Sequence, residues 1–377
     1  MSPTLEPSPP ASAPLVFDLR YATAHYPGVG SYAVGLARAL LERFPEWPWR
    51  FLTPRDAARF DLSFVPAALR EPAGNPSPGA SQLALGRRLN RMGAALYHSP
   101  FMLRPWRARC ASILTVHDVI PLEYPEGMSG FRREVYRRLV GDSLEAERVI
   151  TDSQSSRDAI LAFFPQARPP EVVHPGVRAR GGGEPWPAWE RDAVLTVGIN
   201  KPHKNVKTLI RALALVPAEH RPLLVIAGPN DRRFADPAKL AAQFGVTESV
   251  RVPGMVPEER LDALYRSAAL FAFPTRVEGF GLPLLEALSL GVPALASDIP
   301  VLREVAGDAA RFCAAEDAGA WAQAMLELLR EPASRAELAR RGRERSRAFD
   351  FALASERIGG HYRALVPALA EEARAWR

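Results

Sequence analysis

Two glutamates, Glu278 and Glu286, lie on either side of a glycine-containing turn in "VEGFGLPLLEALSLGVPALAS" (277–297). The first immediately precedes a Gly-x-Gly pair, and the second follows Pro283, which suits the first position of a helix. An apolar run of strand length, "ALFAFP" (269–274), comes before the turn. A strand, a turn and a helix N-terminus in this order offer free backbone N–H groups and a helix dipole to an anion such as a phosphate.

The two carboxylates indicate a second kind of ligand, because they would repel a phosphate. Paired hydroxyls of a sugar or a ribose fit them, since each carboxylate accepts two hydrogen bonds. We expect Glu286 in the first turn of a helix that ends near Gly291, and Glu278 in the loop before it. An alternative stays open, in which Glu286 only complements the helix dipole and Glu278 is a solvated loop acid.

The composition indicates a soluble globular protein of two domains. The chain has 377 residues, of which 47% are hydrophobic and 24% charged, and no apolar run reaches the length of a membrane span. Residues 1–14, "MSPTLEPSPPASAP", lack the features of a signal peptide and are predicted to be a disordered tail. Cys110 and Cys313 are far apart, which favours a cytoplasmic location. No Asp-x-Asp triplet occurs, so we expect no metal site. We also expect no cofactor, apart from a sugar donor that is consumed as a co-substrate.

The net charge of +6 is carried mainly by arginines, since only four of the 48 basic residues are lysines. They cluster in "RPWRAR" (104–109) and in "FRREVYRR" (131–138), where they spread around more than half of a helix. A solvated helix surface is the preferred interpretation, and peripheral contact with anionic lipid or a phosphorylated acceptor is the alternative. Aromatic and basic residues do not alternate, so no nucleic-acid partner is expected.

Strand and helix patterns alternate twice along the chain, which predicts two Rossmann-like α/β domains with parallel sheets and ligands at the carboxyl ends of the strands. We expect an N-terminal domain at 15–178, a glycine- and proline-rich linker at 178–192, and a C-terminal domain at 190–349. The final segment, about 350–377, is expected to cross back to the first domain as a helix. The strands are predicted in "PLVFDL", "WRFL", "AALYHS", "SILTVHD", "RVITDS", "EVVHP", "AVLTVG", "LLVIAG", "SVRVPG", "ALFAFP" and "PALAS".

A resemblance to a known family adds to these expectations. The stretch "EGFGLPLLEALSLGVPALAS" resembles the Glu-x7-Glu signature of the retaining glycosyltransferase family 4, which includes bacterial mannosyltransferases and has the two-domain GT-B architecture. Other pieces follow in the order found in that family, from about Phe17 to Phe312. They are "HYPGVGSYAVGLARAL", "YHSP", "LTVHDVIPLEYPE", "VITDSQSSRDAI", "VGINKPHKN", "LVIAG", "RVPGMVPEERLDALYRSAALFAFPT" and "REVAGDAARF".

The resemblance implies roles for the residues of the second domain. Glu286 would hold the ribose hydroxyls of a nucleotide, and Glu278 the hydroxyls of the donor sugar. Lys204 would stabilise the charge that grows on the departing diphosphate. The family usually places an arginine beside this lysine, where this sequence has His203, so Lys201 is a candidate substitute. The other donor-binding residues expected here are Asn205, Gly228, Val252, Met255, Gly279, Phe280, Gly281 and Leu282.

Three residues of the first domain are expected to face the substrates. Gly28 and Gly30 are predicted to lie before a helix, where backbone could approach a phosphate or a sugar. His117 ends an apolar strand, and the resemblance implies that it contacts the donor sugar and acts in catalysis. The alternative for His117 is a buried residue bonded to a neighbour such as Asp118.

The predicted reaction is the transfer of a sugar from a GDP- or UDP-linked donor to a hydroxyl of a glycan, a lipid-linked saccharide or a small glycoside. We expect retention of the anomeric configuration by a front-face route without a metal ion, because Glu278 serves sugar binding and no other nucleophile is evident. A nucleotide-sugar epimerase and a phosphorylase remain alternatives, as does an inactive sugar-nucleotide-binding protein.

Overall fold

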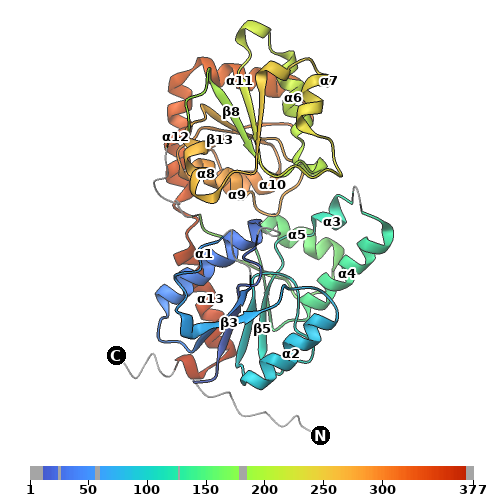
Figure 1. Ribbon diagram of the computed structural model, residues 1–377, viewed down its shortest axis with the longest axis vertical. Coiled ribbons are helices and arrows are strands. Elements are labelled where there is room, and N and C mark those ends of the chain that lie inside the picture. Colours follow the sequence, from blue (N-terminus) through green and yellow to red (C-terminus); the bar gives the residue numbers. More distant parts are fainter. Residues whose placement is uncertain (1–11, 24–26, 56–59, 126–127, 178–184, 371–377) are drawn as a thin grey trace. The chain divides into compact units, whose positions relative to one another are not determined.

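The protein consists of two compact units in the computed structural model, which describes residues 12–23, 27–55, 60–125, 128–177 and 185–370. The first unit comprises Met1–Gly176 and Asp350–Arg377, and the second comprises Val177–Phe349 (Figure 1). Most of the expected tail at 1–14 and part of the expected linker at 178–192 lie outside the described residues. Of the described parts, Ala13 is buried in the first unit, and Trp186 packs against the core of the second.

The first unit contains a seven-stranded, all-parallel sheet in the order β3-β2-β1-β4-β5-β6-β7. The strand order reverses between β1 and β4, and such a switch point is where ligands bind in this class of sheet. The strands are β1 (Leu15–Asp18), β2 (Trp49–Pro54), β3 (Arg70–Ala73), β4 (Leu96–Ser99), β5 (Ala111–Thr115), β6 (Arg148–Thr151) and β7 (Glu171–Val172).

Helices cover both faces of this sheet. Leu15 and Phe17 of β1 point to the face covered by α1, while Val16 points to the face covered by α2. Helix α1 packs on the sheet through an apolar stripe, since Ala33, Leu36 and neighbouring residues are buried in the same core. The helices are α1 (Pro27–Arg43), α2 (Ala80–Met92), α3 (Ile120–Glu123), α4 (Gly130–Leu144), α5 (Gln154–Phe163) and α13 (Phe351–Leu365).

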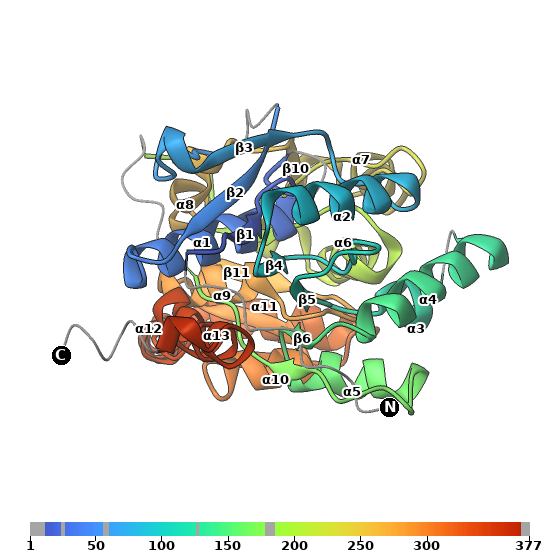
Figure 2. The same ribbon diagram turned by 90° about the horizontal axis from the view of Figure 1, so that it is seen from below.

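The last helix, α13, returns to the first unit, as predicted. It lies beside α1 (Figures 1 and 2). The Tyr362 hydroxyl is 3.0 Å from Nδ1 of His98 on β4, and both side chains are buried. Gly359 allows this close packing, since a Cβ atom there would lie 2.5 Å from the ring of Phe44.

The second unit repeats the same topology with six parallel strands in the order β10-β9-β8-β11-β12-β13, so its switch point lies between β8 and β11. The strands are β8 (Ala193–Val197), β9 (Leu223–Ala227), β10 (Val250–Gly254), β11 (Leu270–Phe273), β12 (Ala294–Ser297) and β13 (Ala310–Cys313). The helices are α6 (Val206–Leu215), α7 (Pro237–Gln243), α8 (Glu258–Arg266), α9 (Leu282–Ser289), α10 (Pro300–Ala306), α11 (Ala318–Arg330) and α12 (Pro332–Ser346).

The core of the second unit also has two layers. Leu195, Phe271 and Phe273 pack against α8, α9 and α10 on one face, whereas Leu224 and Leu270 pack against α6 and α11 on the other. Strands buried on both faces are nearly continuous apolar runs, which is why the sequence predicts them well. Among the described helices, none has the length and apolar composition that a membrane span requires.

Two strands, β3 and β13, were not predicted from the sequence, and both lie at the edge of a sheet. Arg70, Glu71 and Pro72 occupy β3, and Arg311 interrupts β13. Charged residues and proline are tolerated at an edge, because only one side of the strand is hydrogen bonded. These strands therefore lack the apolar run by which the others were predicted.

Candidate functional site

In the second unit, the carboxyl ends of β8 and β11 bring Lys204 and Glu278 together. The two strands pair directly at the switch point, although the two residues are 74 positions apart. Nζ of Lys204 lies 2.5 Å from Oε1 of Glu278. Their side chains are 18% and 8% exposed, so water screens this ion pair only weakly. The sequence predicts three catalytic residues, His117, Lys204 and Glu278, the last as the group that holds the donor sugar, and two of them are thus in direct contact.

The turn that carries Lys204, a 3₁₀ turn at Pro202–Lys204, is fastened to the residues that follow β11. The carbonyl oxygen of His203 accepts hydrogen bonds from the backbone N–H of Arg276, at 2.8 Å, and from the Thr275 hydroxyl, at 3.1 Å. The Arg276 guanidinium also donates to the carbonyl of Pro202. Arg276 was missed in the sequence analysis, although an arginine just after an apolar strand was a usable signal.

Asn205 contributes to the site by holding this loop in place. Its backbone is left-handed, with φ 54°, and its Nδ2 group donates to the carbonyls of Pro274, at 3.1 Å, and Ala315, at 2.8 Å. Its Oδ1 atom accepts a hydrogen bond from Thr208. Both N–H donors of the Asn205 amide are therefore committed to the protein in this structure, and its expected contact with a donor stays a prediction.

His203 is an uncharged residue beside the Lys204 ammonium. Burial, followed by the positive charges of Lys204, Lys201 and Arg276, lowers the pKa of His203 to about 3. The imidazole is therefore neutral at neutral pH and does not replace the charge of the arginine that the resemblance leads one to expect. Lys201 and Arg276 are the other neighbouring cations that act on His203.

Helix α9 begins one residue earlier than predicted. It starts at Leu282, with Pro283 at its second position, and Glu286 is its fifth residue. The expectation that Glu286 lies in the first turn is therefore wrong. The cause is Gly281, whose left-handed backbone, φ 99°, starts the helix directly after the turn, and a Cβ atom there would lie 2.8 Å from Leu302.

The turn between Glu278 and α9 presents backbone rather than side chains. Phe280 is only 4% exposed, and its ring packs edge-on against Phe349 with the centroids 5.6 Å apart. The backbone around Gly279, Phe280 and Gly281 thus leads into the N-terminus of α9, where the amides of the first turn lack helical partners. The helix ends at Ser289, and Gly291 follows with a positive φ, as predicted.

The carboxylate of Glu286 is oriented by Tyr265 of α8. The Tyr265 hydroxyl donates to Oε2 of Glu286 at 2.8 Å, and the tyrosine side chain is fully buried. A buried hydroxyl that binds one carboxylate oxygen restricts the rotamers of the glutamate. Tyr265 was not singled out in the sequence analysis, because the resemblance of this segment assigns it no function and the spacing in the sequence does not bring it to Glu286.

Replacing Tyr265 by phenylalanine is expected to raise the KM for the donor about three- to tenfold and to leave kcat nearly unchanged, because one positioning hydrogen bond is lost. Steady-state kinetics with varied donor would measure this. Tyr362→Phe is the matched control, since it removes another buried tyrosine hydroxyl, in the first unit. Equal KM effects in the two variants would contradict the function of Tyr265 in orienting Glu286.

Glycines allow the strand ends beside this site to approach one another. Gly228 has φ 139°, and a Cβ atom there would lie 2.1 Å from the carbonyl oxygen of Gly198. Its N–H donates to the carbonyl of Gly254 at 2.8 Å. Val252 packs against the core as a half-buried residue, whereas Met255 is 57% exposed at the end of β10. Of these two, the Met255 side chain is the more accessible to a ligand.

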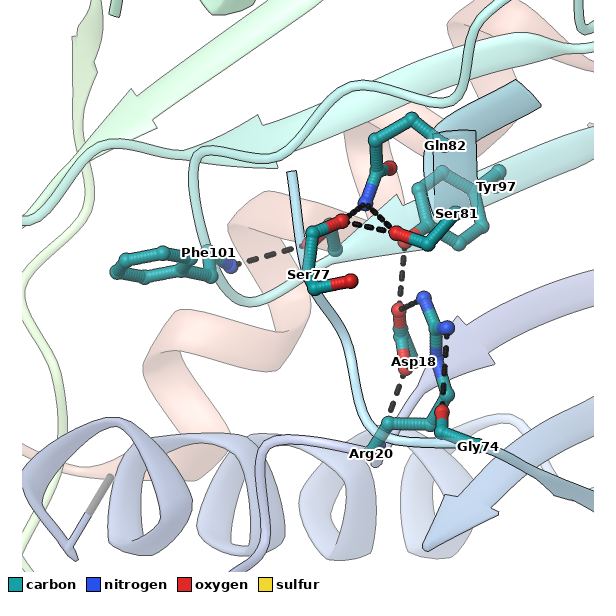
Figure 3. Close-up of polar contacts among 9 residues, drawn as sticks. Asp18, Arg20, Gly74, Ser77, Ser81, Gln82, Tyr97 and Phe101 are labelled. Carbon is teal, nitrogen blue, oxygen red and sulfur yellow. Dashed lines mark hydrogen bonds and ion pairs between the residues drawn. The ribbon is translucent and has the colours of Figure 1, made fainter. Parts of the chain in front are cut away.

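In the first unit, a buried ion pair lies at the carboxyl end of β1. Asp18 is fully buried and accepts hydrogen bonds from the Arg20 guanidinium, at 2.9 and 2.6 Å, and from the Tyr97 hydroxyl, at 2.6 Å. Figure 3 shows the arginine and the tyrosine reaching the same carboxylate, with Arg20 extending toward Gly74. Burial, followed by the charge of Asp18, raises the pKa of Tyr97 well above its usual value, so the phenol keeps its proton and donates it.

His117 follows β5 and is bonded through both ring nitrogens. Nδ1 lies 2.6 Å from Oδ2 of Asp152, and Nε2 lies 2.9 Å from the carbonyl oxygen of Pro100. Burial lowers the pKa of His117, but the charge and the hydrogen bond of Asp152 outweigh it, so the net shift is upward. The partner is thus Asp152 at the end of β6, and Asp118 instead caps the backbone of Ile120. Both ring nitrogens are committed to the protein in this structure.

The raised pKa of His117 predicts a pH-dependent stability. The contribution is complete below the unfolded-state pKa of about 6.5 and is lost as the pH rises through the higher folded-state value. Urea unfolding at a series of pH values from 6 upward should therefore show a decline that His117→Gln lessens. If the unfolding free energies of the wild type and the variant change with pH in the same way, His117 is not the source of the decline.

Gly28 and Gly30 lie inside α1, which begins at Pro27, and not before the helix as predicted. Gly30 has a packing function, since a Cβ atom there would lie 2.6 Å from the ring of Phe60. Gly28 has open space around its Cβ position and is the more accessible of the two.

The chain is similar to characterised proteins over most of its length. The model of the family "Glycosyl transferases group 1" matches residues 188–345. O-antigen chain mannosyltransferase B of Escherichia coli is 31% identical over 274 residues, which are 68% of this chain and 71% of that protein. The serotype-specific mannosyltransferase WbdA of Escherichia coli is 28% identical over 225 residues, but the chain spans only 27% of its length.

Solved structures share the fold. Sucrose-phosphate synthase from Thermosynechococcus elongatus matches with a TM-score of 0.77 and 22% identity, over 94% of this chain and all of that one. Anabaena HepE in complex with UDP and glucose matches with a TM-score of 0.69 and 17% identity, over 93% of this chain and all of that one. These matches confirm the predicted GT-B fold of two Rossmann-like units.

Proposed function

Because the chain belongs to the group 1 glycosyltransferases, we propose that it moves a hexosyl group from a nucleoside-diphosphate sugar to an acceptor hydroxyl with retained anomeric configuration. The observation that supports this most is the Lys204–Glu278 ion pair at the switch point of the second unit. Glu278 lies in the loop that leads into α9, the helix that carries Glu286. Such a donor needs a cation beside its diphosphate, and carboxylates that accept hydrogen bonds from the hydroxyls of its ribose and its sugar.

We assign one part of the donor to each group. Lys204 and the amides at the start of α9 hold the diphosphate, while Glu278 holds the sugar hydroxyls and Glu286 the ribose hydroxyls. Binding the donor would replace the Lys204–Glu278 contact by contacts of both residues with the ligand. Both charges already lie at the strand ends and partly out of water, so little rearrangement is needed.

The proposed chemistry is a front-face displacement. The bond between the anomeric carbon and the phosphate oxygen breaks, and its electron pair stays on the phosphate, where Lys204 stabilises the charge. The acceptor oxygen then bonds to the anomeric carbon on the same face, and its proton passes to the phosphate. Glu278 is assigned to the sugar hydroxyls in the donor complex, so it does not act as the nucleophile of a double displacement.

Mannose is the first sugar to test, because the relatives in Escherichia coli are described as mannosyltransferases. UDP is included among the nucleotides, because the structure of HepE contains UDP and glucose. We propose a growing glycan, free or lipid-linked, as the acceptor, because the first of these relatives is described as an O-antigen chain mannosyltransferase. We propose that no metal ion takes part, since Lys204 supplies the positive charge at the leaving group.

The proposal is tested by incubating the protein with GDP-, UDP- and ADP-linked hexoses, with and without saccharide acceptors. Acceptor-dependent release of a nucleoside diphosphate, an unchanged anomeric configuration in the NMR spectrum of the product, and full activity in EDTA are expected. Conversion of a donor to its epimer without any acceptor would favour the epimerase. No turnover with any donor and acceptor would favour an inactive binding protein.

Contact with an anionic membrane is proposed as part of acceptor access. Helix α4 lies at the outer edge of the first unit in both views (Figures 1 and 2), and its arginines at 132, 133, 137 and 138 are exposed. Phe131 is 80% exposed beside them. Cationic side chains next to an exposed aromatic residue suit the surface of an anionic bilayer.

Vesicle co-sedimentation measures this contact. We expect the protein to bind vesicles that contain phosphatidylglycerol and to bind less at high salt. The double change Phe131→Ser and Arg132→Glu should weaken binding, whereas Arg266→Glu, an exposed arginine of the second unit, should not. Equal binding to neutral vesicles would contradict an electrostatic contact.

A further inference from the structure

A cavity of about 340 Å³ lies in the first unit, at the amino ends of β5 and β6. Ser112, the second residue of β5, and Glu147, just before β6, line it. His117 and Asp152 follow the carboxyl ends of the same strands, five residues further along each. At about 3.3 Å per residue, the cavity is about 16 Å from them, at the opposite edge of the sheet.

The wall of the cavity is formed by the segment before β5, which is fixed to α2. The N–H of Trp106 donates to the carbonyl of Gln82 at 3.1 Å, and Asn90 donates to the carbonyl of Arg107 at 2.9 Å. Gly86 of α2 is in direct contact with the segment, since a Cβ atom there would lie 1.9 Å from the carbonyl oxygen of Trp106. The wall is therefore formed before any ligand binds.

Backbone strain also occurs in this wall. Arg107 has φ 58°, a left-handed conformation that is unfavourable for a residue with a side chain. Such conformations persist where the surrounding structure imposes them, and they concentrate at binding sites. The neighbouring Trp106 is fixed by its backbone N–H on Gln82 and by its indole N–H on Asp142, although its side chain is 40% exposed.

The cavity combines an aromatic ring with carboxylates and guanidinium groups. Nε1 of Trp106 donates to Oδ2 of Asp142 at 3.1 Å, and Arg104 lies 4.0 Å from the other oxygen of Asp142. Oε2 of Glu147 accepts from the N–H and the hydroxyl of Ser112, at 2.8 and 2.7 Å. Within the part of the chain that the structure describes, Oε1 of Glu147 has no hydrogen-bond partner.

We infer that this cavity is a second carbohydrate-binding site, which holds one unit of a neutral glycan away from the place of transfer. Its two arginines, Arg104 and Arg107, balance the charges of Asp142 and Glu147, so the lining favours neither an anion nor a cation. A fixed indole offers a flat apolar surface to a sugar ring, and the charged groups offer hydrogen bonds to its hydroxyls. The volume is within the range of small-ligand pockets.

The inference rests on the proposed function for its biological meaning, because a transferase that extends a glycan benefits from a second site that binds the glycan. The site would anchor long acceptors and leave short ones unaffected. Binding at this site does not involve Lys204, Glu278 or Glu286, so the two proposals can fail separately.

Isothermal titration calorimetry of the full chain with manno-, gluco- and galacto-tetraose tests the inference. We expect saturable binding of at least one of them, weakened about tenfold or more by Trp106→Ala. Glu147→Gln, which keeps an acceptor for Ser112, should weaken binding too and provides a check if Trp106→Ala misfolds. Leu353→Ala is the control, since it removes an exposed apolar side chain outside the cavity and should bind like the wild type.

The outcomes separate the proposals. Oligosaccharide binding that is lost in Trp106→Ala, together with a raised KM for long acceptors only, supports the second site. No binding by the wild type, or binding by Trp106→Ala and Glu147→Gln as tight as that of the wild type, overturns it, even if the protein still binds a nucleotide. Oligosaccharide binding without any nucleotide binding would leave this site in place and overturn the proposed function.

Discussion

Replacing Lys204 by alanine is expected to lower kcat for sugar transfer by about 10²–10³-fold, the range seen when a preorganised group that stabilises a developing negative charge is removed. The lysine is held by Glu278 and by a turn that Arg276 fastens to the end of β11. Its neighbour His203 is neutral, so it offers no charge to compensate. Initial rates with saturating donor and acceptor measure the effect.

Lys207→Ala is the matched control for this variant, because Lys207 is an exposed lysine three positions further along the chain, in α6. We expect it to retain near wild-type kcat. Glu278→Gln gives the complementary test and should raise the KM for the donor more than it lowers kcat, if Glu278 binds sugar hydroxyls. A Lys204→Ala enzyme with a kcat within a few-fold of the wild type would refute the assigned function of Lys204.

Replacing Asp18 by asparagine is expected to destabilise the first unit by about 3–5 kcal/mol, because it leaves the Arg20 guanidinium buried without its counter-ion. The two side chains are 0% and 6% exposed, so solvent cannot compensate. The Tyr97 hydroxyl also loses the charged acceptor to which it donates. Urea unfolding followed by circular dichroism measures the loss as an earlier transition of this unit.

Glu337→Gln is the control for the Asp18 variant, since it also removes a carboxylate that pairs with arginines, but on the exposed surface of α12. It should change the unfolding midpoint little, because exposed pairs are well screened by water. If Asp18→Asn lowers the unfolding midpoint no more than Glu337→Gln does, the buried Asp18–Arg20 pair does not stabilise the first unit.

Most of the fold could be predicted from the sequence because parallel strands buried on both faces are continuous apolar runs. That signal gave β1, β8, β9 and β11, whereas the edge strands β3 and β13 carry Arg70, Glu71 and Arg311 and lack it. The start of α9 was displaced by one residue, because Gly281 adopts a left-handed conformation that the sequence permits but does not specify.

The sequence indicated residues of the candidate site but not the contacts between them. Glu278, Glu286 and Lys204 were identified from a turn and from a resemblance, yet the Lys204–Glu278 pair depends on β8 lying beside β11. Tyr265 and Asp152 were missed as partners, because each is brought in by a separate helix or strand. No local pattern marks a residue whose function is to orient another.

The measurement that tests the central claim most directly is the thermal unfolding of the wild type and of Glu286→Gln with UDP, GDP, ADP and their sugars. A nucleotide present at about 100 times its Kd stabilises the folded state by about 2.7 kcal/mol. We predict that at least one nucleoside diphosphate or its sugar raises the Tm of the wild type and raises that of Glu286→Gln much less. No shift with any nucleotide, or equal shifts in both proteins, would contradict the claim that the second unit binds a nucleotide sugar through these residues.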